Sequence, residues 1–277
     1  MSVKREASGR RSVQVEVELP GTPEQIWQAI ATGQGITSWF APTKVEERNG
    51  GKIVTQMAPG MESAATITAW EPPLRLAVED PGWAPSMPPV ATEWTIETRP
   101  GGTCLVRVVH SLFASTDDWD NQLAGTETGW PGFFRILRLY LAHFPGQLCS
   151  SISVMGTPSG PVAEGWQELT GALGLTGALV GQKRSAPAAA PPFSGTVECV
   201  TEEKGMHSLL LRLEEPAPGF VSIGAFDCGG MVMASVSFYL YGERGAAAAA
   251  REQSRWDEWM KQQFPAAGEA GNAATGA

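Results

Sequence analysis

The chain is short of the residues from which metal sites and disulfides are built. Its 277 residues include three histidines and four cysteines. Cys104, Cys149, Cys199 and Cys228 lie far apart and form no CxxC pair, so we expect free thiols and neither a zinc site nor a disulfide framework. No metal and no cofactor is predicted.

Basic residues are also scarce. Lys and Arg number 20 against 29 Asp and Glu, which gives a formal net charge of -9 and a pI near 4.9. Nucleic acids and anionic lipids bind clusters of Lys and Arg. The densest basic cluster lies within residues 1–11, a polar stretch that we expect to be disordered, and no nucleic-acid partner is predicted.

Long apolar runs are missing. None reaches the roughly 18 to 20 residues that a transmembrane helix needs. The first residues also lack the apolar segment of a secretory signal. We therefore expect a cytoplasmic protein without a membrane partner, and the many Ala, Gly and Pro residues are typical of a bacterium with a GC-rich genome.

Motifs that define enzyme classes are missing too. The chain has no GxSxG, no HExxH, no phosphate-binding P-loop and no glycine-rich dinucleotide fingerprint. No motif therefore assigns an enzyme class.

What the chain does have is a clear order of predicted elements. Apolar residues alternate over residues 12–19, which predicts a half-buried strand. Thr22 and Gln25 then form the signature of a helix that begins with a capping box. This helix is expected to end near residues 33–35, and residues 36–40 to add a second helical turn.

Residues 44–113 have the pattern of antiparallel strands joined by short turns. Turn-forming residues recur at Asn49-Gly50, Glu71-Pro72-Pro73 and Pro100 to Gly102. Over residues 121–144 the apolar period becomes helical, which predicts a long amphipathic helix. Its apolar face carries Trp130, Phe133, Phe134, Leu137, Leu141 and Phe144.

The second half of the chain repeats this plan. At an offset of 139 residues (166 minus 27), Trp27-Gln28 aligns with Trp166-Gln167, and Gly35-Ile36-Thr37 aligns with Gly174-Leu175-Thr176. A closing helix ends at Phe264-Pro265, as the first long helix ends at Phe144-Pro145. We therefore predict two tandem domains: a first at 12–147 and a shortened second at 148–265, with a low-complexity loop at 185–193 and a disordered tail at 266–277.

Three segments of the first domain resemble a known family. GITSWFAPTKVEERNGGKI (35–53), APGMESAATITAWEPPLRL (58–76) and LAGTETGWPGFFRILRLYLAHFPGQ (123–147) closely resemble bacterial SRPBCC proteins of the family named for the activator of heat-shock-protein-90 ATPase. The resemblance covers residues 12–147. It implies the START-like (Bet v-like) helix-grip fold, an α+β fold in which an antiparallel sheet curves around a long C-terminal helix. The second half departs from the family, because Ala178-Leu179 stands where Trp39-Phe40 would be.

Proteins of this superfamily hold apolar molecules between sheet and helix. The resemblance therefore implies a hydrophobic small molecule as partner, bound without catalysis in the cavity of the first domain. The same large side chains also suit an ordinary core. The candidate ligand-binding residues are Trp39, Phe40, Met57, Met61, Trp94, His110, Trp130, Phe133, Phe134 and Leu137.

Two alternatives stay open. The superfamily includes cyclases, aromatases and hydrolases, and His110 is a candidate catalytic acid or base because its strand is expected to face the helix. A pair among Glu62, Asp80 and Glu93 would serve if it converged inside the cavity. The other alternative is a protein-interaction module, as a monomer or homodimer, such as a regulator of a chaperone ATPase.

Overall fold

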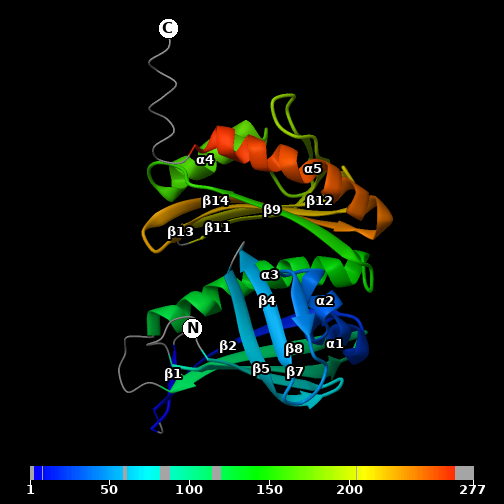
Figure 1. Ribbon diagram of the computed structural model, residues 1–277, viewed down its shortest axis with the longest axis vertical. Coiled ribbons are helices and arrows are strands. Elements are labelled where there is room, and N and C mark those ends of the chain that lie inside the picture. The colour runs from blue at the N-terminus through cyan, green and yellow to red at the C-terminus, as the bar shows by residue number, and fades with distance from the viewer. Residues whose placement is uncertain are drawn as a thin grey trace. The chain divides into compact units, whose positions relative to one another are not determined.

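The chain divides into two compact units, unit 1 at Met1–Gln147 and unit 2 at Leu148–Ala277. Figure 1 shows this computed structural model, which describes residues 3–7, 9–58, 61–81, 88–113, 120–203 and 205–265. Across those described ranges, no helix is long and apolar enough to cross a membrane.

Unit 1 is an antiparallel sheet with two short helices near its start and one long helix at its end (Figure 1). Its strands lie in the order β1-β2-β8-β7-β6-β5-β4-β3, so the first long strand pairs with the last one. The elements are β1 (Lys4–Arg5), β2 (Arg10–Pro20), α1 (Pro23–Ala31), α2 (Gly33–Thr37), β3 (Thr43–Val45), β4 (Lys52–Ala58), β5 (Met61–Glu71), β6 (Arg75–Asp80), β7 (Val90–Arg99), β8 (Thr103–Phe113) and α3 (Asp120–His143).

Side-chain alternation gives this sheet an apolar face, which we call the inner face. Leu76, Trp94 and Val108 lie side by side on it across β6, β7 and β8, and all three are buried. Ring contacts between Trp94 and the aromatic side chains of α3 place the helix on this face. The α+β helix-grip fold expected from the sequence is confirmed.

The start of unit 1 matches some expectations and corrects others. The capping box at Thr22 and Gln25 is present and begins α1. α1 ends at Ala31, however, and the predicted terminating glycines lie inside α2. A Cβ atom at Gly35 would lie 1.8 Å from the carbonyl oxygen of Gln28, so this glycine allows the two helices to touch.

Residues 1–11 were predicted to be disordered, and this is wrong for the strand residues among them: Lys4–Arg5 form β1, and β2 begins at Arg10. β1 pairs with the start of β2, where Lys4 lies opposite Ser12. Val3 packs on the buried pair Val13 and Leu112. Strand pairing with β2 and partial burial of Val3 therefore order a stretch whose polar composition favours disorder.

Unit 2 has the same kind of sheet with one helix after its first strand and one at its end (Figure 1). The strand order is β10-β11-β12-β13-β14-β9, so again the first strand pairs with the last. The elements are β9 (Cys149–Gly156), α4 (Val162–Ala172), β10 (Lys183–Ser185), β11 (Ser194–Glu203), β12 (Met206–Glu215), β13 (Gly219–Cys228), β14 (Met231–Tyr241) and α5 (Gly242–Gln263).

One continuous core fills unit 2. α4 packs on β12 to β14, and α5 packs along β9 and β14. Between helices and sheet lie fully buried side chains that include Leu211, Phe238 and Trp256. Of these six strands, the sequence pattern predicts β11, β12 and β14, in the segments GTVECV, SLLLRLEE and GMVMASVSFYLYG, and misses β9, β10 and β13. β13 is buried at consecutive positions and so shows no alternation.

Candidate functional site: an aromatic cluster under α3

A cluster of rings joins α3 to the inner face of the first sheet. Trp130 lies at its centre, with ring centroids 5.1 Å from Trp94, 5.2 Å from Phe134 and 5.5 Å from His110. Phe40 stacks on the same indole at 6.2 Å. We call this set the aromatic cluster: Trp39, Phe40, Trp94, His110, Trp130, Phe133 and Phe134.

Burial divides the cluster into two layers. Trp39, Trp94, His110 and Phe134 are between 2% and 8% exposed. Phe40, Trp130 and Phe133 are only half-buried. The half-buried layer therefore offers aromatic surface to solvent in front of a closed aromatic floor.

The corner after α2 fixes one wall of the cluster. The Trp39 indole N–H donates a hydrogen bond of 2.9 Å to the carbonyl of Ala29, which ties the ring to α1. The Gly35 amide donates to Thr32 Oγ1 at 3.0 Å and caps α2. The indole of Trp39 is thus fixed by α1, while the Trp39 backbone amide donates to the carbonyl of Ile36 in α2.

His110 is the polar centre of the cluster. Its Nδ1 lies 2.8 Å from Thr92 Oγ1, on the residue directly opposite it across β7 and β8. Its Nε2 accepts a hydrogen bond from the Trp130 indole N–H. Because an indole nitrogen can only donate, Nε2 is the unprotonated nitrogen, and the ring proton on Nδ1 donates to Thr92.

Burial keeps this imidazole neutral. It lowers the pKa of His110 from 6.5 to about 4, and no charged neighbour contributes among the residues that the structure describes. At neutral pH His110 is therefore a neutral side chain with both nitrogens bonded. Proton transfer by His110 requires Trp130 or Thr92 to release the ring first.

The structure brings together most of the residues predicted for the site. Seven of them form the aromatic cluster, and Leu137 lies fully buried on α3 one turn further on. Met57 lies on β4 and Met61 begins β5, but their side chains are outside the described part of the chain. Their contribution stays a prediction, as does ligand binding by the others.

Thr92 belongs to this site and was missed from the sequence. The signal that would have found it is register: once β7 and β8 are paired through the Pro100 to Gly102 turn, Thr92 faces His110. The indole of Trp130 comes from a different element after residues 114–119, so no local pattern predicts that contact.

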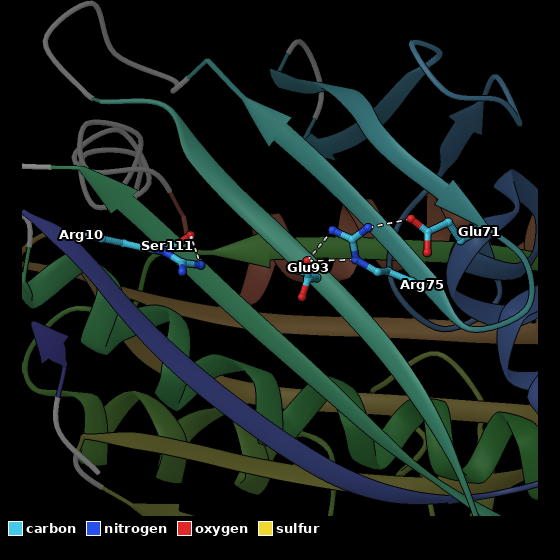
Figure 2. Close-up of polar contacts among 5 residues, drawn as sticks. All are labelled: Arg10, Glu71, Arg75, Glu93 and Ser111. Carbon is cyan, nitrogen blue, oxygen red and sulfur yellow. Dashed lines mark hydrogen bonds and ion pairs between the residues drawn. The ribbon is translucent and has the colours of Figure 1, made fainter. Parts of the chain in front are cut away.

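Of the carboxylates considered for acid–base chemistry, Glu93 lies on the face of the sheet that is opposite to this cluster. Glu93 follows Thr92 and precedes Trp94 on β7, so its side chain points to the opposite, outer face. There Arg75 bridges Glu71 and Glu93, at 2.7 Å and 2.9 Å (Figure 2). Hydrogen bonds with Glu93 and then Glu71 raise the pKa of Arg75 above its ordinary value.

The other two carboxylates differ in position, since Asp80 shares the inner face with Leu76 by alternation along β6. Glu62 is exposed on β5. Asp80, at the end of β6, accepts a 2.7 Å hydrogen bond from Ser63. Among the described residues, no three His, Cys, Asp or Glu side chains lie close enough to hold a metal ion.

Residues 20–142 match the sequence model of the family described as activator of Hsp90 ATPase homolog 1-like protein. No protein of curated function matches the chain.

Solved structures are similar to this chain at low identity. CalU16 from Micromonospora echinospora is 20% identical over 51% of this chain and 83% of its own, with a TM-score of 0.41. MLL2253 from Mesorhizobium loti is 24% identical over 48% of this chain and 98% of its own, with a TM-score of 0.44. DynU16, from the dynemicin biosynthetic locus, is 16% identical over 91% of this chain and 95% of its own, with a TM-score of 0.41.

Proposed function

We propose that unit 1 binds a hydrophobic small molecule between its sheet and α3, without catalysis, because residues 20–142 match the model of the activator of Hsp90 ATPase homolog 1-like family. The match to this family's model supports a ligand-binding or regulatory module. The observation that carries the proposal is the layered aromatic cluster, in which half-buried rings lie over fully buried ones.

The half-buried rings supply affinity for an apolar molecule. Each 100 Å² of apolar surface removed from water contributes about 2.5 kcal/mol, and flat rings add favourable stacking geometry. Phe40 and Phe133 meet edge to face at 4.7 Å, and Phe40 stacks on Trp130. A planar ligand that inserts against these faces replaces water on several of them at once.

Catalysis by His110 has less support. Its two nitrogens are already bonded, and its pKa of about 4 makes it a poor base near neutral pH. The regulatory alternative, including a protein partner or homodimer, stays a prediction.

We also propose that unit 2 is a shortened copy of unit 1. The support is topological: in each unit the first long strand, β2 or β9, is followed by a helix, the later strands lie in chain order, and the last strand pairs with that first long strand. The repeat of Trp27-Gln28 at Trp166-Gln167 falls on the same helix in both units, α1 and α4. Under this proposal the domains span residues 12–147 and 148–265.

Equilibrium dialysis with naphthalene tests ligand binding by unit 1. We expect saturable binding, and we expect Phe133→Ala to weaken it about tenfold, because the variant removes one half-buried ring. Leu179→Ala, at an exposed position of unit 2, is the control and should bind as the unsubstituted chain does. Absence of saturable binding, or equal loss in both variants, would contradict the proposal.

A further inference from the structure

The polar centre of the aromatic cluster specifies a chemical class of ligand. We propose that the molecule bound by unit 1 is a neutral aromatic compound with a hydroxyl or N–H donor, and that this donor replaces the Trp130 indole on His110 Nε2. This inference rests on the proposed binding function and adds to it the group that is recognised.

The first support is the fixed direction of the His110 ring. Thr92 Oγ1 accepts from Nδ1–H at 2.8 Å, which leaves Nε2 as an acceptor turned toward α3. The ring is 6% exposed, so a lone acceptor there would be costly unless a donor met it. In the structure the indole N–H of Trp130 supplies that donor.

The second support is the position of Trp130. It is half-buried, whereas His110 behind it is buried, so the indole stands between solvent and the acceptor. Its ring is stacked on His110 and on Phe134 with interplanar angles of 18° and 25°. A planar ligand that took the place of the indole would meet the same rings in the same geometry.

The third support is the backbone next to Trp130. Pro131 follows it inside α3 and has no N–H, so the helical hydrogen bond to the carbonyl of residue 127 cannot form. A Cβ at Gly132 would meet nothing within 4 Å. α3 is therefore held less firmly at the residue that has to move.

Charge decides against an anionic ligand. Burial is the cause of the lowered pKa of His110, and no cationic side chain contributes to it within the described ranges. A carboxylate that entered would face the unprotonated Nε2 with no counter-charge, which costs more than it gains. A neutral phenol or alcohol instead donates to Nε2 and keeps its ring against the aromatic walls.

Four probes separate the contributions of the ring, the hydrogen-bond donor and the charge of the ligand: naphthalene, 2-naphthol, 2-methoxynaphthalene and 2-naphthoate. By equilibrium dialysis at pH 7 we expect 2-naphthol to bind roughly three- to tenfold more tightly than 2-methoxynaphthalene, the range that one hydrogen bond supplies. The 2-naphthoate anion should bind most weakly. Equal binding of the naphthol and its methyl ether, or tighter binding of the naphthoate, would overturn the inference.

Two variants test the named contacts. Trp130→Phe keeps a ring but removes the competing indole N–H, so the preference for 2-naphthol should grow at least threefold. Thr92→Val removes the acceptor that fixes the His110 proton on Nδ1, so the preference should shrink toward one. Trp70→Phe, a half-buried tryptophan of unit 1 that packs on Trp27, is the matched control and should leave all four affinities unchanged.

A spectroscopic readout is independent of affinity. The ¹⁵N shifts of His110 should report a neutral ring with its proton on Nδ1, in the free protein and with 2-naphthol. A proton on Nε2 in the free protein would overturn the assignment of Nε2 as the acceptor. If naphthalene binds but the hydroxyl adds nothing, the inference fails alone; if no probe binds, the proposed function fails with it.

Discussion

Each unit contains a histidine stacked on a tryptophan with an interplanar angle of 18°, but the two pairs are connected differently. In unit 1, Trp130 comes from the closing helix and donates to His110. In unit 2, His207 stacks on Trp166 of α4, and its Nδ1 has no partner among the described residues.

The closing helices differ in the same way. The central ring of α5, Trp256, is fully buried against Phe238 at 4.9 Å and Trp259 at 5.5 Å, and its indole nitrogen has no hydrogen-bond partner in the described part of the chain. Trp130 of α3 is half-buried and bonded. The closing helix of unit 2 is therefore fully packed at its central ring, whereas the closing helix of unit 1 keeps its central ring half-exposed, as the proposed recognition role requires.

The largest expected effect tests the packing role of unit 2. Trp256→Ala should cost about 3 to 5 kcal/mol of stability, because it removes a fully buried ring and leaves a cavity. Trp130→Ala should cost about 1 to 2 kcal/mol, because its ring is half-exposed. Hydrogen exchange read by mass spectrometry on peptides from each unit measures both.

The same exchange data test whether the units are separate domains. Trp256→Ala should speed exchange in residues 149–264 and leave the strands of unit 1 protected. Equal acceleration in both units would contradict the two-domain proposal.

The next effect uses the buried histidine of unit 1. Its folded pKa of about 4 lies below the unfolded value of 6.5, so between these values the unfolded chain binds a proton that the folded chain does not. Stability should therefore fall as the pH drops from 6.5 to 4, by roughly 3 kcal/mol at most. Urea denaturation across this range measures the loss.

Two variants isolate that contribution. His110→Gln should lose this part of the pH dependence, whereas His143→Gln, at an exposed position near the end of α3, should keep it. An unchanged pH dependence in His110→Gln would show that His110 is not the group responsible.

The smallest effect concerns the outer face of the first sheet. Arg75→Met should cost less than about 1 kcal/mol, although it breaks both ion pairs in Figure 2, because all three charged side chains are at least 39% exposed. The cost should fall further in 1 M salt. A loss above 2 kcal/mol in the same denaturation assay would show that this face is stabilised by more than exposed charges.

Local chemistry made much of unit 1 predictable. The capping box at Thr22 begins α1, and the glycines at 50, 101 and 102 adopt positive φ at the turns where the sequence placed them. The apolar face of α3 was readable from its period. These features depend on residues within a few positions of one another.

For the candidate site, the sequence predicted which aromatic residues take part but not how they are hydrogen-bonded. His110 is hydrogen-bonded through both ring nitrogens because the register of β7 and β8 places Thr92 opposite it and because α3 carries Trp130. Neither contact can be predicted from residues next to His110 in the sequence. β9 was missed although Ile152 and Val154 alternate with exposed neighbours, because serines make up much of the strand. Long-range pairing decided what local propensity left open.

The pairing of first with last strand has a consequence for synthesis on the ribosome. β2 can pair with β8 only after residues near His110 have been synthesised, because Val13 lies opposite His110. In the same way β9 can pair with β14 only after Val236, the partner of Val154, has been synthesised. The first long strand of each unit therefore lacks its partner until the last strand has been synthesised, and one of its edges stays unpaired during much of translation. Unit 1 can complete its fold while unit 2 is still emerging, which limits the time during which both edges are exposed together.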